Sequence, residues 1–352
     1  MLNHKLSIGI VGLPNAGKST LFNALLKKQL AKVAPYPFTT IEPHEGVIDV
    51  PDVRLTNLTL MVKPDKSTPS AITFIDIAGL VKNAHKGEGL GNEFLGHIRE
   101  VSAILQVVRA FESSDAPHTL TTVDPDRDME IINTELLLKD LDTISKKIAG
   151  EKEADKKALF EKAKESLNKE LPINKLRLNS EEDLLIKDLQ LLTSKPMFYV
   201  LNISEKELET KKLKALEEKD FLIVCAKLEA DLIALSPAEQ AEYLISLGVT
   251  SSGLDKVIKE AYSILNLITF YTIKGGKEVR AWPIPKETAV LTAAGMVHTD
   301  FAKHFIKAEV ISYPEFIKYT SWSAAKEAGK IDLVGHDYLV KDGDIIEFKV
   351  GV

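Results

Sequence analysis

Cysteine is almost absent from the sequence, since Cys225 is the only one among 352 residues. A single cysteine cannot form a disulfide within the chain, and it excludes zinc sites of the usual cysteine-rich kind. Long apolar runs are also missing, because no stretch of the sequence reaches about 18 uninterrupted apolar residues. The first residues lack the charged and apolar regions of a secretion signal. We therefore expect a cytoplasmic protein with no membrane partner.

An excess of positive charge is missing as well. Lys and Arg total 45 against 51 Asp and Glu, which gives a net charge of −6. This balance removes the simplest electrostatic case for nucleic acid as a partner of the whole chain, and we expect no sequence-specific DNA binding, although a local basic patch is compatible with it. The length predicts two or three domains at roughly 150 residues each.

Short apolar runs without clean alternation predict strands that are covered on both faces. Helical stretches separate these runs, and this order indicates an α/β fold with a mostly parallel sheet. The predicted strands are residues 5–11, 71–76, 103–110, 197–202 and 221–225.

Two parts of the chain depart from this α/β pattern. A middle region is rich in Lys, Glu and Leu, with apolar residues three and four apart, which predicts a pair of antiparallel helices. A C-terminal region has short alternating strands joined by small helices, which predicts a separate α+β domain. The expected domains are a discontinuous sheet domain at 1–125 and 196–267, a helical insert at 126–195 and the small domain at 268–352.

Residues 12–19 read Gly-Leu-Pro-Asn-Ala-Gly-Lys-Ser and match the phosphate-binding pattern G-x-x-x-x-G-K-[ST]. The motif lies between a predicted strand and a predicted helix, which is the context that this chemistry requires. Its glycines let the backbone present N–H groups to phosphate, and the following helix adds its positive end. Lys18 would reach the β- and γ-phosphates as a catalytic group, and the Ser19 hydroxyl would bind Mg²⁺. The expected nucleotide contacts in this loop are Gly12, Asn15, Ala16, Gly17, Lys18, Ser19 and Thr20.

Two further segments complete the expected γ-phosphate site. Asp76 ends a predicted strand, where its carboxylate can hold Mg²⁺, and the Gly79 N–H can approach the γ-phosphate. Thr39 and Thr40 lie in a loop bounded by prolines. We expect Thr40, rather than Thr39, to sense the γ-phosphate through Mg²⁺.

The group that orients the attacking water is not evident from these motifs. Leu80 occupies the place where many GTPases carry a glutamine for this purpose. We therefore expect slow hydrolysis or help from another residue. His85, His97 and His118 lie in this region of the sequence, and for each of them a surface or core role is the alternative to catalysis.

Residues 202–205 read Asn-Ile-Ser-Glu, where GTPases carry Asn-Lys-x-Asp. The aspartate of that motif accepts hydrogen bonds from guanine N1–H and the exocyclic amine, so a longer glutamate and an isoleucine in place of the stacking lysine weaken guanine recognition. Adenine is therefore the expected base. Residues 225–227, Cys-Ala-Lys, take the place of the loop that covers the base. The expected base contacts are Asn202, Ser204, Glu205, Cys225 and Ala226.

Together these motifs resemble those of the YchF/Obg-like ATPase family, within the Obg-related P-loop proteins. The resemblance covers essentially the whole chain. The segments that carry it are residues 12–20, 37–43, 76–81, 86–92, 202–205, 277–282, 298–301 and 341–344.

This resemblance implies an Obg-type P-loop domain interrupted by a coiled-coil insert and followed by a TGS domain of β-grasp type. It implies preference for ATP over GTP and a hydrophobic residue in place of the water-orienting glutamine, which Leu80 matches. It also implies association with the ribosome, through the large subunit or the whole particle, by rRNA or ribosomal proteins. The family's proposed catalytic histidine falls on His118, and Asn15 matches an asparagine that some relatives use with K⁺. We expect a monomer.

The sequence thus predicts a molecular switch in which Mg·ATP orders the Thr40 loop and residues 86–91, and hydrolysis releases them. One alternative is an Obg-type GTPase that tolerates Glu205. Another is a ribosome-associated module that binds ATP structurally and hydrolyses it only incidentally. The insert lysines expected to contact rRNA phosphates are Lys146, Lys147, Lys156 and Lys157.

Overall fold

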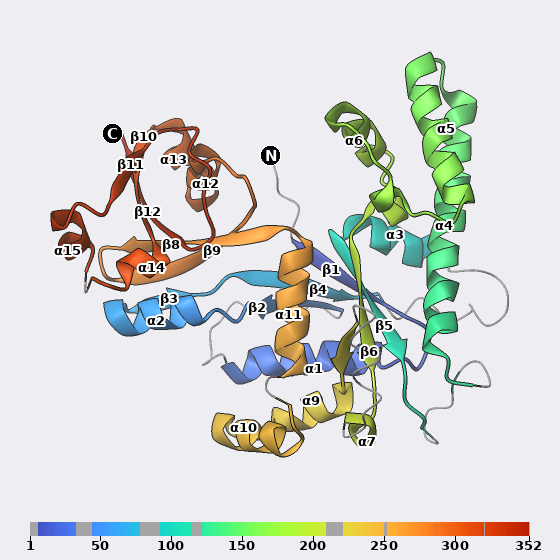
Figure 1. Cartoon of the computed structure of the whole chain (residues 1–352), viewed down its shortest axis with the longest axis horizontal. Coiled ribbons are helices and arrows are strands. Elements are labelled where there is room, and N and C mark those ends of the chain that lie inside the picture. Colours follow the sequence, from blue (N-terminus) through green and yellow to red (C-terminus); the bar gives the residue numbers. More distant parts are fainter. Residues whose placement is uncertain are drawn as a thin grey trace. The chain divides into compact units, whose positions relative to one another are not determined.

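The chain folds into two compact units, which are shown in Figure 1 in a computed structural model. Unit 1 comprises Met1–Ile48 and Thr73–Ile264, and unit 2 comprises Asp49–Ile72 and Leu265–Val352. The structure describes residues 6–32, 44–77, 92–113, 118, 122–208, 221–249, 252–319 and 321–351. Within these ranges, no helix is both long enough and apolar enough to cross a membrane.

Unit 1 is built on a six-stranded sheet with the strand order β2-β4-β1-β5-β6-β7. The pairs from β4 through β7 are all parallel, and every residue of β1 and β5 is buried. The predicted parallel α/β sheet is therefore confirmed. The strands are β1 (Ser7–Val11), β2 (Glu45–Asp49), β4 (Ala71–Asp76), β5 (Ala103–Arg109), β6 (Met197–Asn202) and β7 (Leu222–Val224).

Helices pack against this sheet through apolar faces, which form because apolar residues recur three and four positions apart. In α11, Leu254, Val257, Ile258 and Ala261 are buried, and their spacing of three and four places them on one face. The helices of unit 1 outside its long central insertion are α1 (Lys18–Lys32), α3 (Asn92–Glu100), α7 (Glu205–Leu208), α9 (Ala226–Leu232), α10 (Pro237–Ser246) and α11 (Gly253–Ile264).

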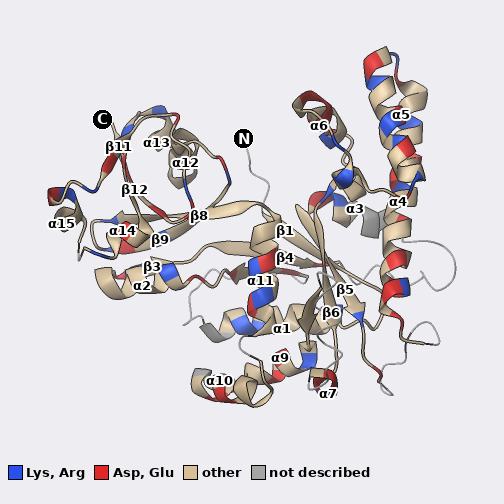
Figure 2. Ribbon diagram, viewed as in Figure 1, with Lys and Arg blue, Asp and Glu red and all other residues tan. Residues whose placement is uncertain are grey.

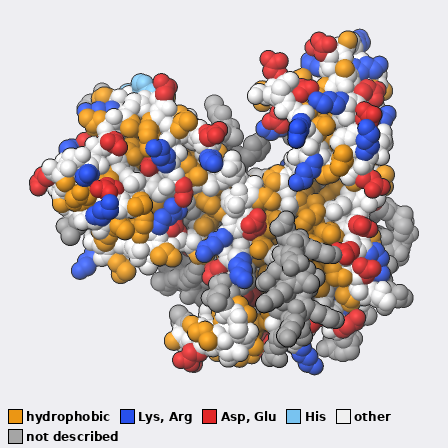
Figure 3. All heavy atoms as spheres, viewed as in Figure 1, with side chains coloured by type: hydrophobic (Ala, Val, Ile, Leu, Met, Phe, Trp, Pro, Cys, Tyr) orange, Lys and Arg blue, Asp and Glu red, His pale blue; other side chains and the backbone are white. Residues whose placement is uncertain are grey.

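Two long helices form an arm on unit 1, as the Leu spacing predicts. The arm consists of α4 (Pro125–Gly150) and α5 (Ala154–Asn168), followed by α6 (Ser180–Lys187) and the short helices η3 (Ile173–Lys175) and η4 (Leu192–Ser194). Ile144 and Ile148 of α4 share one apolar cluster with Leu159 and Ala163 of α5. Basic and acidic residues alternate along the ribbon of the arm in Figure 2, and Figure 3 shows their side chains interspersed on its surface. That residues 126–195 form a domain of their own stays a prediction.

A buried carboxylate joins the last short helix of the arm, η4, to α4. Asp140 of α4 is fully buried and accepts hydrogen bonds from Leu192 N at 2.8 Å, Thr193 N at 2.7 Å and Thr193 Oγ1 at 2.7 Å. Burial raises the pKa of Asp140, although these hydrogen bonds act in the opposite direction. The carboxylate therefore holds η4, which directly precedes β6, against α4.

Unit 2 is an α+β fold around a second six-stranded sheet, of order β11-β10-β12-β8-β9-β3. Its β8–β9 and β10–β12 pairs are antiparallel, and its β12–β8 and β3–β9 pairs are parallel. The strands are β3 (Lys66–Thr68), β8 (Leu267–Lys274), β9 (Glu278–Pro285), β10 (Phe305–Ser312), β11 (Asp332–Val334) and β12 (Asp344–Val350). The helices are α2 (Val53–Val62), α12 (Val290–Val297), α13 (Thr299–Lys303), α14 (Tyr313–Phe316) and α15 (Trp322–Glu327).

The segment Asp49–Ile72 departs from the expected division of the chain. The sequence predicts it within the first domain, at 1–125, but the structure places it in unit 2. Leu55 and Leu58 of α2 pack in one cluster with Tyr271 and Val279 of β8 and β9. Strand β3 also lies beside β9. These partners are about 200 residues away in the sequence, so no local sequence pattern predicts that α2 and β3 pack against them.

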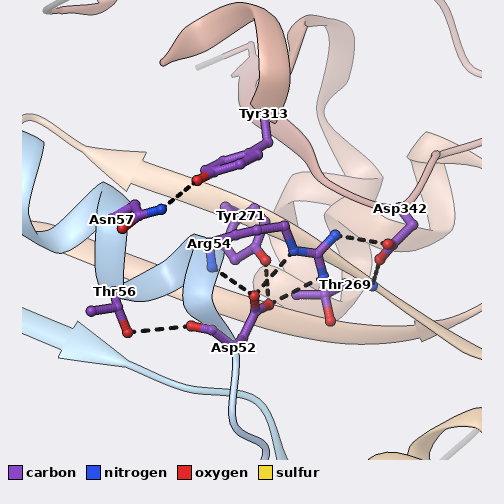
Figure 4. A network of polar contacts seen from close by, with 8 residues as sticks. All are labelled: Asp52, Arg54, Thr56, Asn57, Thr269, Tyr271, Tyr313 and Asp342. Atoms are coloured by element: carbon purple, nitrogen blue, oxygen red, sulfur yellow. Dashed lines mark hydrogen bonds and ion pairs between the residues drawn. The ribbon is translucent and has the colours of Figure 1, made fainter.

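A polar network adds to this packing (Figure 4). Asp52 caps α2 by accepting a hydrogen bond from Arg54 N at 2.9 Å, and it also accepts one from the Tyr271 hydroxyl. Arg54 Nη1 contacts Asp342 Oδ2 at 2.7 Å, and Asn57 Nδ2 donates to the Tyr313 hydroxyl at 2.8 Å. The segment is therefore joined to the rest of unit 2 by both apolar and charged contacts.

Candidate nucleotide-binding site

The predicted phosphate and base motifs meet at the carboxyl edge of the unit 1 sheet. Ile10 of β1 pairs with Asp76 of β4, and Arg109 of β5 pairs with Asn202 of β6. The ends of neighbouring parallel strands thus converge on the loop that follows β1. In open parallel sheets this edge is where ligands bind.

The loop between β1 and α1 has the backbone geometry that its glycines predict. Gly12 has a φ of 152° and Gly17 a φ of 94°, both in a region that favours glycine. Space also requires these glycines, because a Cβ at Gly12 would collide with the Val107 carbonyl oxygen and one at Gly17 with the Asn202 side chain. Asn15 is left-handed as well, with a φ of 62°, and its side chain is exposed. The loop therefore folds tightly, with helix α1 starting directly after it.

Lys18 is buried at the start of α1 and points back over the loop. Its Nζ donates a hydrogen bond to the Leu13 carbonyl oxygen at 2.7 Å. Burial lowers the pKa of Lys18 to about 8, while the Asp76 carboxylate acts in the opposite direction. A partly desolvated ammonium group of this kind gains much from a phosphate partner.

Ser19 and Asp76, which are both expected to bind Mg²⁺, are in direct contact. Ser19 Oγ donates a hydrogen bond to Asp76 Oδ2 at 3.0 Å, although the two residues are 57 positions apart. A hydroxyl beside a carboxylate offers the oxygen ligands that Mg²⁺ prefers. Thr20 is exposed in the first turn of the same helix. The other members of the predicted γ-phosphate site, Thr40 and Gly79, lie outside the described residues, as does Leu80.

Mg²⁺ at such a site takes most of its remaining ligands from phosphate and water rather than from a cage of side chains. In the part of the chain that the structure describes, no group of three or more His, Cys, Asp or Glu side chains is arranged to hold a metal.

Asn202 joins the phosphate loop to the loop after β7. Its Nδ2 donates to the Ala16 carbonyl oxygen at 3.0 Å, and its Oδ1 accepts from Ala226 N at 3.0 Å. Cys225 precedes Ala226 and is buried, and this burial raises the pKa of its thiol. The structure thus brings Asn202, Ala226 and the phosphate loop together, as the motifs predict.

The other residues of the base-recognition segment have partners within the protein. Ser204 donates from both its N–H and its Oγ to Glu207 Oε2, at 2.8 Å each. Glu205 Oε1 accepts a hydrogen bond from the Tyr243 hydroxyl at 2.7 Å. Ile203 is only 4% exposed and packs in a core cluster. Position 203 therefore offers no side chain that can stack on a base.

His118 is held by the first turn of α4. Its Nε2 lies 2.6 Å from Asp128 Oδ2, and the two side chains are 6% and 2% exposed. Arg127 Nη2 lies 3.1 Å from the other carboxylate oxygen of Asp128. Of the other two candidate histidines, His97 is exposed on α3, whereas His85 lies outside the described residues.

Two buried charged residues that contact predicted site residues do not belong to any of the motifs. Arg109 is fully buried, and it donates from Nε to the Phe111 carbonyl oxygen at 2.9 Å and from Nη1 to the Asn15 carbonyl oxygen at 3.3 Å. Asp128 is the partner of His118. An arginine at the end of a strand that is otherwise uncharged is a sequence signal for the first. No pattern in the sequence marks the second.

Comparison with known families gives two matches along the chain. Residues 7–147 match a model described as "50S ribosome-binding GTPase". Residues 267–351 match the model YchF-GTPase_C, which is described as "Protein of unknown function (DUF933)".

The chain also matches known proteins over nearly its full length. The chain is 45% identical to "Ribosome-binding ATPase YchF" of Bacillus subtilis, over 99% of this chain and 100% of that protein. It is 46% identical to "Ribosome-binding ATPase YchF" of Escherichia coli O157:H7, over 98% of this chain and 99% of the other. The solved structure of the Schizosaccharomyces pombe YchF GTPase superimposes with a TM-score of 0.90 at 37% identity, covering 99% of both chains.

Proposed function

The chain belongs to the YchF family, and from this premise we propose that it is a ribosome-associated P-loop ATPase that acts as a nucleotide-dependent switch. The observation that carries the proposal is the phosphate site, where Lys18 lies over the loop and Ser19 Oγ contacts Asp76 Oδ2 at 3.0 Å. The loop N–H groups and the Lys18 ammonium bind the β- and γ-phosphates.

Mg²⁺ is the cofactor that fits this donor set. Ser19 and Asp76 would hold it, with Thr40 as the expected third residue, and the bound ion would neutralise charge that develops on the phosphates during transfer. The exposed Asn15 is the expected contact for K⁺.

His118 is the proposed group for activation of water, because Leu80 has no hydrogen-bonding side chain. The Asp128 carboxylate holds the His118 ring at Nε2 and so restricts its orientation. A histidine held in this way can orient a water molecule or take a proton from it. Turnover by the isolated chain is slow, since this arrangement replaces the glutamine of ordinary GTPases.

ATP rather than GTP is the proposed substrate. The names of the relatives differ on this point, since those from Bacillus subtilis and Escherichia coli are called ATPases and that from Schizosaccharomyces pombe a GTPase. Two features of this chain support adenine. Ile203 is buried instead of lying over the base, and Glu205 replaces the guanine-binding aspartate.

The ribosome is the proposed partner, because the bacterial relatives are named ribosome-binding ATPases. The family model that matches residues 7–147 is also described as a "50S ribosome-binding GTPase". The arm and unit 2 are additions that phosphate chemistry does not require, and they are the proposed contact surfaces. The switch acts in the cytoplasm as a monomer.

Two measurements on the full chain test this function. Calorimetric titration with non-hydrolysable ATP and GTP analogues should show tighter binding of the ATP analogue, and a tenfold preference for GTP, about 1.4 kcal/mol, would overturn the choice of adenine. Phosphate release should rise when ribosomes are added. Turnover that ribosomes leave unchanged would instead favour a module in which hydrolysis is incidental.

A further inference from the structure

Arg109, the last residue of β5, is a buried arginine that contacts the phosphate loop. Its side chain is 1% exposed. The backbone of β5 lies against the same loop, because a Cβ at Gly12 would collide with the Val107 carbonyl oxygen. From the end of this strand, Arg109 Nη1 donates a hydrogen bond to the Asn15 carbonyl oxygen at 3.3 Å, and Nε donates to the Phe111 carbonyl oxygen at 2.9 Å.

The positive charge of Arg109 is not balanced by a carboxylate in the part of the chain that the structure describes. Besides the two carbonyl oxygens, its neighbour is the Phe111 ring, whose centroid lies 4.4 Å from the guanidinium carbon. Neutral oxygens and an aromatic face offset only part of the cost of burying a charge. A guanidinium cannot lower this cost by losing its proton, because it stays protonated in proteins. The free protein therefore keeps an unbalanced positive charge beside the loop.

The contact with Asn15 also fixes how the loop presents its N–H groups. In a trans peptide the C=O and N–H bonds point in opposite directions, so an Asn15 carbonyl held toward Arg109 turns the Ala16 N–H away from it. This N–H donates to the Leu13 carbonyl oxygen at 3.3 Å, and Lys18 Nζ donates to the same oxygen at 2.7 Å. Two donors of the phosphate loop thus converge on the opposite side of the Asn15–Ala16 peptide from Arg109.

A phosphate group that takes these two donors has the Asn15–Ala16 peptide between itself and Arg109. Charges act strongly over such a short separation when water does not reach them, because the effective dielectric constant is lower than in water. We propose that Arg109 is a positioning residue for the nucleotide phosphates: it holds the Asn15 carbonyl outward, and its buried charge is balanced by the bound phosphates across the loop. The inference rests on the phosphate site of the function proposed above and adds a residue that lies outside the phosphate-binding motif.

The test is Arg109→Met in the full chain, with the Kd of a non-hydrolysable ATP analogue measured by calorimetry at pH 7. Methionine is an unbranched side chain without charge, and the calorimetric stoichiometry reports the folded fraction, so the Kd refers to folded molecules only. The Kd should rise about tenfold, the order of magnitude for one charge that acts across a layer of backbone. Arg109→Lys keeps the charge but loses the planar fork, so its Kd should lie between those of the wild type and Arg109→Met.

Arg54→Met is the matched control. Arg54 also lies over an aromatic ring, that of Tyr271 at 5.5 Å, but in unit 2 it pairs with the carboxylates of Asp52 and Asp342. Its replacement takes the cation away from two carboxylates and should lower the thermal midpoint of the free chain, while the Kd for the ATP analogue stays unchanged.

A wild-type Kd in Arg109→Met would overturn the proposal. Equal weakening by methionine and lysine would also overturn it, because the charge would then have no effect. A rise in Kd for Arg54→Met as large as that for Arg109→Met would show that the loss reflects a general weakening of the fold. A wild-type chain that binds neither ATP nor GTP analogues would instead contradict the proposed function itself.

Discussion

At the scale of single residues, the Lys18 ammonium connects nucleotide binding to pH. Its pKa in the free protein is about 8 because the side chain is buried. Bound phosphates favour the charged form and raise this pKa, so at pH values above about 8 the binding of ATP requires uptake of a proton. The affinity for ATP should therefore be constant below this pH and fall as the pH rises through it.

Titrations with a non-hydrolysable ATP analogue from about pH 7 to about pH 9.5 check this dependence, and buffers with different ionisation heats report the proton uptake. Lys18→Ala should bind the analogue more weakly and lose the proton uptake. Wild-type affinity that stays flat across this range would show that Lys18 keeps its charge throughout.

The buried pair of His118 and Asp128 is the second residue-scale feature. His118→Ala should leave ATP affinity unchanged and lower kcat by about 100-fold, within the usual range for a positioned acid–base group. Asp128→Asn should lower kcat less, because the ring keeps a neighbour of the same size but loses the carboxylate that orients it. Single-turnover kinetics and the pH profile of kcat measure both effects.

His97→Ala is the control for these variants, since His97 is exposed on α3. Wild-type kcat in His118→Ala would transfer the water-activating role to another group, such as a backbone amide or a group on the ribosome.

At the scale of elements, the arm tests the proposed ribosome contact. Changing Lys146, Lys147, Lys156 and Lys157 to Gln should weaken co-sedimentation with ribosomes and make it less sensitive to salt. The logarithm of the binding constant falls linearly with the logarithm of the salt concentration, and each lost phosphate contact reduces the steepness of that fall by about 0.9, the value for duplex DNA. Lys146 lies 2.7 Å from Asp142 and Lys156 lies 2.7 Å from Glu153, so the change should be smaller than four full contacts.

ATP binding by this fourfold variant should stay at the wild-type level, because the substituted lysines lie on the arm helices α4 and α5 and belong to none of the nucleotide motifs. Co-sedimentation with an unchanged salt slope would place the contact surface elsewhere than on these lysines.

Elements and motifs differ in how far they can be predicted from the sequence. The buried strands, the phosphate loop and the two arm helices are predictable because their patterns are local. The pairing of Ser19 with Asp76 follows from motifs at the ends of neighbouring parallel strands. Asp128 and Tyr243 are not predictable in this way, because each acts on a partner in another element and neither belongs to a motif.

At the scale of the whole molecule, the segment Asp49–Ile72 determines which truncated chains should fold and stay in solution. A chain that ends at Ile264 keeps α2 but lacks the residues of β8 and β9 against which Leu55 and Leu58 pack. It should bind a hydrophobic dye and aggregate at concentrations at which the full chain stays in solution. Light scattering and dye fluorescence measure this.

A second truncation that also replaces residues 51–69 with a short Gly-Ser turn should recover solubility and bind ATP. The turn can be short, because Val50 N donates to the Ser70 carbonyl oxygen at 2.8 Å. This second chain is therefore the suitable one for asking whether loss of unit 2 reduces ribosome co-sedimentation, as we expect. Equal solubility of the two truncations would show that α2 does not need the residues of unit 2 that follow Ile264.

The same segment also determines the order in which the two units can fold during synthesis. A ribosome releases α2 and β3 early, yet Leu265, the first residue of their remaining partners, follows Ile72 by 193 residues. At about 5–20 residues per second, this separation corresponds to a wait of about 10–40 s. Throughout that interval the apolar face of α2 lacks the β8 and β9 residues against which it packs. All elements from β4 to α11 are synthesised before these residues are available. Unit 1 can complete its sheet during synthesis, whereas the sheet of unit 2 forms only after β8 and β9 have been made, so the apolar face of α2 is where a chaperone would bind the growing chain.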